Sequence, residues 1–263
     1  MIQTHNCDNR QWLPFIEDKS IRLILTDPPY NVLNLDWDNW DFREYIQRFD
    51  NIVDGYLAIF GPYRLLSELT TYAVATTGFE NLFEYVWVKS TFPLTRVNYK
   101  HPTYQHELIP VLCNNPDVGF NHVKIAAKAE IKKRNRKIKS EYEGAKMSGM
   151  AGSYISDNKG EKYTSTVLYG PSKAQMDESE RTKHPTQKPL NIIRHIIQAL
   201  TNEGDWVLDP FGGSGTVAVA CKQLNRNCII IEQNKEYYDI MMDRLSKTFP
   251  DTKIKNSSLD RLL

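Results

Sequence analysis

Short apolar runs alternate with amphipathic segments along both ends of the chain, and this alternation is what most limits the folds open to the sequence. The apolar runs have the length of strands. In the segments between them, apolar residues recur at three- and four-residue spacing, as in helices that pack on one face. The strand-like runs are 21–26, 56–60, 85–89, 107–113, 206–210 and 228–233. The helix-like segments are 41–53, 62–75, 189–200, 216–224 and 235–245.

Strands that alternate with helices of this length predict βαβ units, and so an α/β fold with a mostly parallel sheet covered on both faces. One pair departs from the alternation, because no helical pattern separates 85–89 from 107–113. We therefore expect one antiparallel strand. A chain of 263 residues, with 41% apolar and 25% charged side chains, is long enough for one large domain or for one domain with an insertion.

The composition of the sequence changes between residues 120 and 183, where the apolar periodicity is lost and Gly, Ser, Lys and Tyr are the most frequent residues. This segment is predicted to be an insertion. It carries fourteen basic and eight acidic side chains, whereas the whole chain has a net charge of only +1. Its densest basic run suits a phosphate backbone, although a solvated basic loop would have the same composition. The candidate nucleic-acid contacts are Lys132, Lys133, Arg134, Arg136, Lys137 and Lys139.

The cysteines and the N-terminus exclude several classes of protein. Cys7, Cys113, Cys221 and Cys228 form no CxxC pair and have no spacing typical of a zinc site or a disulfide framework, so we expect no metal. The N-terminal sequence lacks a basic stretch followed by an apolar one, and no run approaches the roughly 18 apolar residues of a membrane span. The sequence therefore predicts a soluble, cytoplasmic protein that makes no contact with membranes.

A glycine-rich turn follows the strand-like run that begins at residue 206, in the sequence WVLDPFGGSGTVAVA. Glycines there permit a positive φ and a close approach of the backbone to a ligand, and the helix that follows points its free N–H groups at the same place. Glu232 ends the next strand, where Rossmann-type sites use a carboxylate to bind ribose hydroxyls. Asp209 precedes the turn, where it would repel a pyrophosphate but suits a cationic ligand such as S-adenosylmethionine. The turn also fits the fingerprint of a dinucleotide-binding site, and glycines there can serve only to pack the helix against the sheet.

The sequence TDPPYN, 26–31, follows the strand-like run 21–26 and raises the question of what it binds. Asp27 is predicted at the carboxyl end of a parallel strand, where α/β sheets bind their ligands. Pro28 and Pro29 remove two N–H donors, so the backbone offers only carbonyl acceptors, and Tyr30 adds a flat stacking face. This set suits the amino group of a nucleobase, which has to be flipped out of a duplex. Trp37 and Trp40, in the loop that follows, are candidates to close over the base.

These motifs resemble those of the DNA amino-methyltransferases that use S-adenosylmethionine. DPPY at 27–30 looks like their catalytic motif, and DPFGGSGT at 209–216 looks like their cofactor motif. The order of the two motifs, with a basic insertion between them and KHPTQKP at 183–189, is similar to the β group of the family. The resemblance implies a circularly permuted Rossmann-like methyltransferase fold, in which one domain is split into a catalytic half and a cofactor half. The expected segments are 1–119, the target-recognition insertion 120–183, the cofactor half 184–250 and a tail 251–263.

The resemblance also assigns roles to individual residues. Asp27, Pro28, Pro29 and Tyr30 would be catalytic. Asp8 would approach the adenine of the cofactor, Glu232 its ribose, and Thr186, Gln187 and Lys188 its carboxylate. The methionine end would be lined by Asp209, Pro210, Phe211, Gly213, Gly215 and Thr216.

In this family an acid at the first motif position accompanies adenine N6 targets more often than cytosine N4, so Asp27 favours adenine. Methylation of cytosine N4 stays open, as does a non-catalytic DNA-binding module. Cytosine C5 methylation needs a thiolate, usually after proline, and none of the four cysteines follows a proline. Related RNA and release-factor enzymes carry the cofactor motif first. The implied partner is double-stranded DNA in a restriction-modification setting, with a homodimer and a cognate restriction endonuclease left open.

Overall fold

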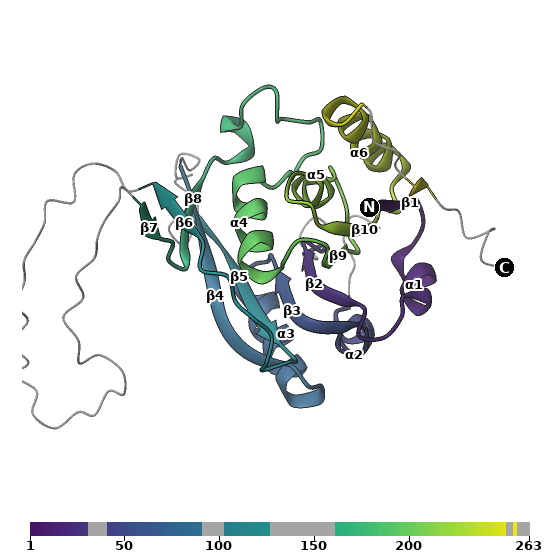
Figure 1. The fold of residues 1–263 in the computed structure, drawn as a ribbon, viewed down its shortest axis with the longest axis vertical. Helices are drawn as coiled ribbons and strands as arrows, with labels where there is room; N and C mark the ends of the chain where they lie inside the picture. Colours follow the sequence, from purple (N-terminus) through teal and green to yellow (C-terminus); the bar gives the residue numbers. More distant parts are fainter. Residues whose placement is uncertain (31–40, 91–102, 127–160, 251–254, 257–263) are drawn as a thin grey trace, which may run out of the picture. The chain divides into compact units, whose positions relative to one another are not determined.

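The computed structural model describes residues 1–30, 41–90, 103–126, 161–250 and 255–256 (Figure 1). In this part of the chain, nine strands form one sheet in the order β11-β1-β10-β9-β2-β3-β5-β4-β8. The strands are β1 (Ile2–His5), β2 (Ile21–Thr26), β3 (Val53–Ile59), β4 (Glu80–Lys89), β5 (His106–Cys113), β8 (Val167–Gly170), β9 (Trp206–Asp209), β10 (Asn227–Ile231) and β11 (Lys255–Asn256). All six strand-like runs of the sequence are strands of this sheet.

The sheet is mostly parallel, as predicted. Each neighbouring pair from β11 to β3 is parallel, and so is the pair of β4 and β8 at the other edge. Strand β5 is the exception, because it runs antiparallel to both β3 and β4. The prediction of one antiparallel strand is therefore confirmed, and its cause is the direct connection from β4 to β5 without a helix.

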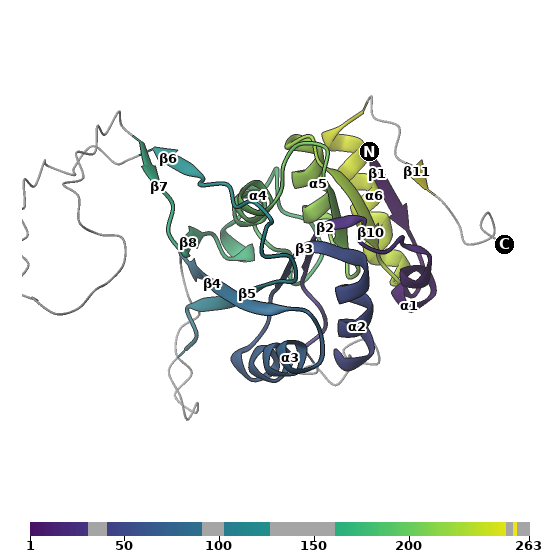
Figure 2. The same ribbon diagram turned by 60° about the horizontal axis from the view of Figure 1, so that its bottom comes forward.

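Helices cover both faces of the sheet (Figure 2). The first three helices lie on one face and the last three on the other. The helices are α1 (Asn9–Trp12), α2 (Arg43–Ile52), α3 (Tyr63–Thr76), α4 (Leu190–Leu200), α5 (Thr216–Gln223) and α6 (Lys235–Thr248), with short 3-10 turns at Leu13–Phe15 and Lys173–Gln175. No helix in the described ranges is both long and apolar enough to cross a membrane.

The core lies between the sheet and these helices. On one face Ile46, Phe49 and Ile52 of α2 are completely buried against the sheet, and on the other Ile196 and Ile197 of α4 are buried in the same way. The α2 positions 46, 49 and 52 recur at helical spacing, which is the pattern that predicted a helix there. Burial of each such side chain stabilises the fold by roughly 1.5–3 kcal/mol. The packed helices therefore hold the carboxyl ends of the strands in fixed positions.

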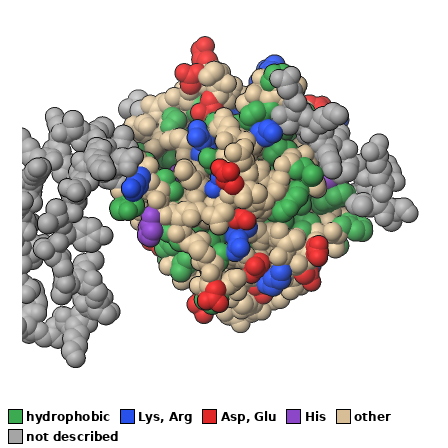
Figure 3. Space-filling model, in the orientation of Figure 1, with side chains coloured by type: hydrophobic (Ala, Val, Ile, Leu, Met, Phe, Trp, Pro, Cys, Tyr) green, Lys and Arg blue, Asp and Glu red, His purple; other side chains and the backbone are tan. Residues whose placement is uncertain are grey.

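A second compact unit consists of His122–Thr164. Its described part includes an antiparallel pair of strands, β6 (Lys124–Ala126) and β7 (Glu161–Tyr163). The expected insertion, 120–183, also included residues 165–183, which belong to the main unit because β8 adds to the main sheet beside β4. The six basic residues predicted to contact nucleic acid lie outside the described residues. Basic and acidic side chains are interspersed on the described surface seen in Figure 3.

Candidate active site

The two sequence motifs meet where β2 and β9 end side by side. From β2 the chain continues through α2 to β3, on one side, and from β9 it continues through α5 to β10, on the other. Because the connections diverge, a crevice opens at the carboxyl ends of these two strands, where open α/β sheets bind ligands. The Thr26 hydroxyl of β2 donates a hydrogen bond of 2.9 Å to Asp209 Oδ1 of β9. This bond ties the two motifs together although they are far apart in the sequence.

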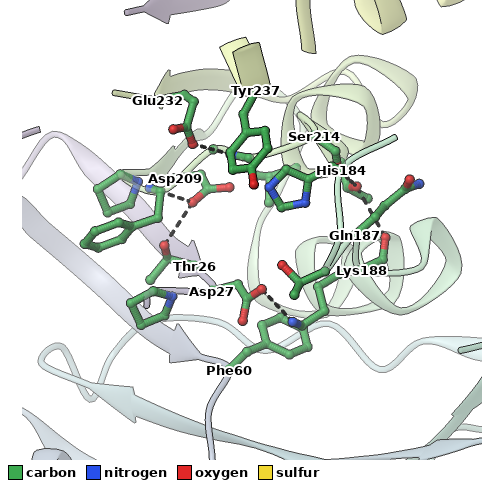
Figure 4. Close-up of a pocket in the computed structure, with 18 of the residues that line it drawn as sticks. Thr26, Asp27, Phe60, His184, Gln187, Lys188, Asp209, Ser214, Glu232 and Tyr237 are labelled. Carbon is green, nitrogen blue, oxygen red and sulfur yellow. Dashed lines mark hydrogen bonds and ion pairs between the residues drawn. The ribbon is translucent and has the colours of Figure 1, made fainter. Parts of the chain in front are cut away.

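The crevice contains a pocket with a volume of about 290 Å³ (Figure 4). Its volume is close to the lower end of the range for small-molecule sites, about 300–1,000 Å³. Both motifs and the segment before α4 contribute to its wall. The predicted site residues that line it are Asp27, Pro28, Pro29, Tyr30, Thr186, Gln187, Lys188, Asp209, Pro210, Phe211, Gly213, Thr216 and Glu232. Of the predicted site residues in the main unit, Asp8 and Gly215 do not line the pocket.

Asp8 instead caps the short helix α1. Its carboxylate accepts hydrogen bonds from the Arg10 backbone N–H, at 2.9 Å, and from the Arg10 guanidinium. The next residue, Asn9, lines the pocket in its place, and it donates to the Pro210 carbonyl at 2.8 Å while accepting from the Tyr45 hydroxyl at 3.0 Å. Sequence reasoning missed Asn9, since only its position after the first strand indicates that it lies near a ligand.

The glycine-rich turn is held by contacts from Glu232 and from Arg244. Gly213 has a φ of 49°, and its N–H donates to Glu232 Oε2 at 2.8 Å. The other Glu232 oxygen accepts from the Asn234 N–H at 2.7 Å. From α6, Arg244 donates to the Ser214 carbonyl and to the Thr216 hydroxyl. The turn is therefore rigid before any ligand arrives, and its close packing explains why glycines recur in it.

Gly215→Ala is expected to destabilise the fold by about 2–4 kcal/mol, since the substitution combines backbone strain with a steric clash. Gly215 has a φ of 75°, and a Cβ atom there would lie 2.6 Å from Met241 Cγ. Chemical denaturation of the variant measures the loss. Gly204→Ala is the matched control, because Gly204 also has a positive φ, 86°, but a Cβ atom there would meet nothing within 4 Å. An equal loss in both variants would contradict the role of Met241.

Asp209 is a buried carboxylate at the base of the pocket. Asp209 is 4% exposed, and this burial raises the pKa of its carboxyl to about 7. The pKa is raised even though the Thr26 hydroxyl and the Phe211 N–H donate hydrogen bonds to the carboxylate. Burial also raises the pKa of Glu232. Buried carboxylates that lack a cationic partner favour the binding of a positively charged ligand, because such a ligand restores the balance of charge.

The second half of the pocket is built around Asp27. Tyr30 donates its hydroxyl hydrogen bond to Asp27 Oδ1, and the Lys188 ammonium lies 2.5 Å from Asp27 Oδ2. Burial raises the pKa of Asp27, and Lys188 opposes that rise. The ammonium also lies 5.3 Å from the centre of the Phe60 ring. Lys188, which was predicted to border the carboxylate of a cofactor, lines the pocket, and its ammonium contacts the DPPY motif.

The segment before α4 is shaped by Gln187. Its side-chain oxygen accepts hydrogen bonds from the Thr182 N–H and hydroxyl, and its amide donates to the Glu180 carbonyl at 2.9 Å. These contacts fold the segment back on itself, so that Thr186 lies exposed at the rim while Lys188 is buried. Gln187 is therefore a structural residue of the pocket wall as well as a lining residue.

His184 and Tyr237 form a wall of the pocket that sequence reasoning missed. Their rings meet edge to face with 4.3 Å between centroids (Figure 4). Burial lowers the pKa of His184 to about 4, with a contribution from the positive charge of Lys188, so the ring is neutral at physiological pH. Its buried Nδ1 atom makes no hydrogen bond to any described residue. A ligand in the pocket can supply the missing partner.

Comparison with known proteins agrees with this geometry. A family model described as DNA methylase matches residues 21–243. The Type II methyltransferase M.HpaI of Haemophilus parainfluenzae is 30% identical over 266 residues, which cover 95% of this chain and 76% of that protein.

Two solved structures share the fold. The chain in the crystal structure of the M1.HpyAVI-SAM complex is 28% identical in sequence to this chain, and the TM-score is 0.62. The match covers 93% of this chain and 100% of that one. The PvuII DNA methyltransferase, described as cytosine-N4-specific, is 14% identical with a TM-score of 0.63, and its match covers 97% of this chain and 96% of that one. At that identity the PvuII likeness concerns the fold alone. The methyltransferase fold expected from the two motifs is therefore confirmed, and the chain belongs to the DNA methylase family.

Proposed function

We propose that this protein transfers a methyl group from S-adenosylmethionine to the exocyclic N6 of a flipped-out adenine in double-stranded DNA. The observation that carries the proposal is the meeting of two acids in one pocket, each at the end of its own strand. Asp209 suits a cationic methyl donor, and Asp27 suits an amino group. A pocket lined by both acids has room to hold donor and acceptor side by side.

The residues around Asp209 fit S-adenosylmethionine. The cofactor is cationic at its sulfonium and ammonium groups, and the buried carboxylate of Asp209 lacks a cationic partner among the residues that surround it in the described structure. Glu232 lies at the end of β10, as ribose-binding acids do, and His184 Nδ1 offers a further polar contact. The M1.HpyAVI relative was solved in complex with this cofactor. When bound, S-adenosylmethionine supplies an electrophilic methyl group.

Asp27 is then placed to act on the target base. Asp27 accepts a hydrogen bond from the amino group, which localises the nitrogen lone pair that is otherwise delocalised into the ring. Positive charge would grow on the nitrogen as its bond to the methyl carbon formed and the methyl–sulfur bond of the cofactor broke, leaving S-adenosylhomocysteine, and a carboxylate beside the nitrogen would stabilise that charge. The amino group loses one proton, and Asp27 is placed to accept it, since burial raises the pKa of its carboxyl. No covalent bond between enzyme and base is needed.

Adenine is proposed over cytosine because an acid, Asp27, stands first in the DPPY motif. The fold does not discriminate between the two bases, as the likeness to the cytosine-N4-specific PvuII protein illustrates. A base inside a duplex is out of reach of this pocket, so the target has to be flipped. The basic residues 132–139 of the insertion are proposed to bind the phosphates that hold the duplex in place.

Incubation of the purified protein with methyl-labelled cofactor and unmethylated duplex DNA, followed by digestion to nucleosides, tests the function. Label in N6-methyl-2′-deoxyadenosine is the expected result. Label in N4-methylcytosine would replace adenine by cytosine but keep the amino chemistry. Label in 5-methylcytosine would overturn that chemistry, and cofactor binding without any transfer would indicate a non-catalytic DNA-binding module.

A further inference from the structure

Glu107 approaches the Lys188 ammonium from β5, a strand that is separated from β2 by β3 in the sheet. It belongs to β5, directly opposite Trp87 of β4, and Lys89 projects from the same face two residues farther along β4. The Lys89 ammonium lies 2.7 Å from Glu107 Oε1. The sequence indicated neither Glu107 nor Lys89 as a site residue, because each looks like an ordinary polar residue at the end of a strand.

The Lys188 ammonium lies between two carboxylates. It is 2.5 Å from Asp27 Oδ2 and 3.5 Å from Glu107 Oε2, and its side chain is 8% exposed. Glu107 Oε2 is buried and accepts no hydrogen bond from the described residues. The ammonium is thus bonded to one acid while a second acid, with a free acceptor position, lies within reach of a small side-chain movement.

Both oxygens of Asp27 already accept hydrogen bonds, one from Tyr30 and the other from Lys188. An amino group that enters the pocket competes with the Lys188 ammonium for Asp27. A buried ammonium that leaves Asp27 with no other carboxylate to receive it is strongly destabilised, so it would not yield to a neutral amino group. A second carboxylate on its other side removes most of that penalty.

We propose that Glu107 is a positioning residue of the methyl-transfer site, which receives the Lys188 ammonium when the target amino group binds Asp27. This inference rests on the proposed function. Lys89 keeps Glu107 charged and in place, and together with Lys188 it holds the pKa of the buried Glu107 carboxyl below its ordinary value. The four charges of Asp27, Glu107, Lys89 and Lys188 balance, so the ammonium can move between the acids without changing the net charge of the site.

Glu107→Gln tests the proposal, because the amide has the same shape but no charge. We expect kcat to fall about 10- to 100-fold, since Lys188 then stays on Asp27. The KM for DNA and the Kd for S-adenosylmethionine should stay within about two-fold of the parent, because Glu107 makes none of the phosphate contacts that hold the DNA. Glu107→Asp keeps the charge with a shorter reach, and its kcat should lie between those of the parent and the Gln variant.

Glu84→Gln is the matched control, since Glu84 is an exposed acid on β4 and should leave all three constants unchanged. Turnover is expressed per cofactor-binding site, so that a smaller folded fraction does not imitate a catalytic loss. A Gln variant with parental kcat, or an Asp variant no better than the Gln variant, would overturn the role of Glu107. If the parent protein itself labels no adenine, the proposed function fails instead, which keeps the two failures distinguishable.

Discussion

Asp27→Asn is expected to reduce methyl transfer at least ~100-fold while the affinity for S-adenosylmethionine changes by less than about two-fold. The amide keeps the size of the carboxylate and one acceptor oxygen. It loses the negative charge that stabilises the growing positive charge on the target nitrogen, and it loses the site that takes the departing proton. Single-turnover methyl transfer, together with equilibrium cofactor binding, measures the two quantities separately.

The split between turnover and binding follows from where Asp27 lies. Its contacts are with Tyr30 and Lys188, on the side of the pocket formed by the DPPY motif, whereas the cofactor turn is held by Glu232 and Arg244. Asp239→Asn is a suitable control, because Asp239 is an exposed acid of α6 that is paired with Lys235 and lies outside the pocket lining. Turnover of Asp27→Asn within ten-fold of the parent would mean that another group binds the amino nitrogen.

Asp209→Asn is expected to weaken S-adenosylmethionine binding by about 10- to 100-fold at pH 8, and yet to stabilise the ligand-free protein. Asparagine keeps an oxygen for the Thr26 hydroxyl and the Phe211 N–H but carries no charge. The parent has to bury a carboxylate that lacks a counter-ion, and the variant does not. Isothermal titration with the cofactor and chemical denaturation without it give the two measurements.

The pH dependence supplies an independent check on Asp209. Its pKa of about 7 in the fold lies above its ordinary value of 3.8, so the folded protein binds the proton more tightly than the unfolded chain. The free energy of unfolding of the parent therefore falls as pH rises from about 4 to about 7, by up to about 4 kcal/mol, relative to the Asn variant. Cofactor affinity of the parent changes in the opposite sense and rises between about pH 6 and about pH 8, since the carboxylate that binds the cation forms there. A parent and variant with parallel pH profiles would contradict this assignment.

The main elements of the fold were predictable because their periodicity is strong. All five helix-like segments are helices, and Asp27 and Asp209 lie at strand ends in one crevice, as the motifs predicted. Periodicity gave no indication of β8, which is four residues long and alternates exposed and buried positions next to a segment of mixed composition. The expected insertion was therefore too long at its C-terminal end.

The least predictable parts of the site are single side chains that act across the sheet. Asn9 and Glu107 reach the motifs only through tertiary contacts with Pro210 and Lys188, and no spacing in the sequence marks them. Lys188 illustrates the same limit, since nothing in its place in the sequence indicated that its ammonium would contact Asp27. Motifs identify the chemistry of a site, but the direction of a long side chain depends on packing.

The strand order also determines when the protein can fold during synthesis. Strand β1 pairs with β10, so that Ile2 opposes Cys228, and β2 pairs with β9, which brings Leu23 beside Val207. The ribosome therefore releases the first two strands about 200 residues before their partners, at a synthesis rate of about 5–20 residues per second. For some ten seconds or more their apolar edges stay without those neighbours, and such non-local pairing is slow and prone to aggregation. The permuted chain thus depends on late closure of its sheet, and we expect its yield in cells to respond to the rate of translation and to chaperones that bind exposed strands.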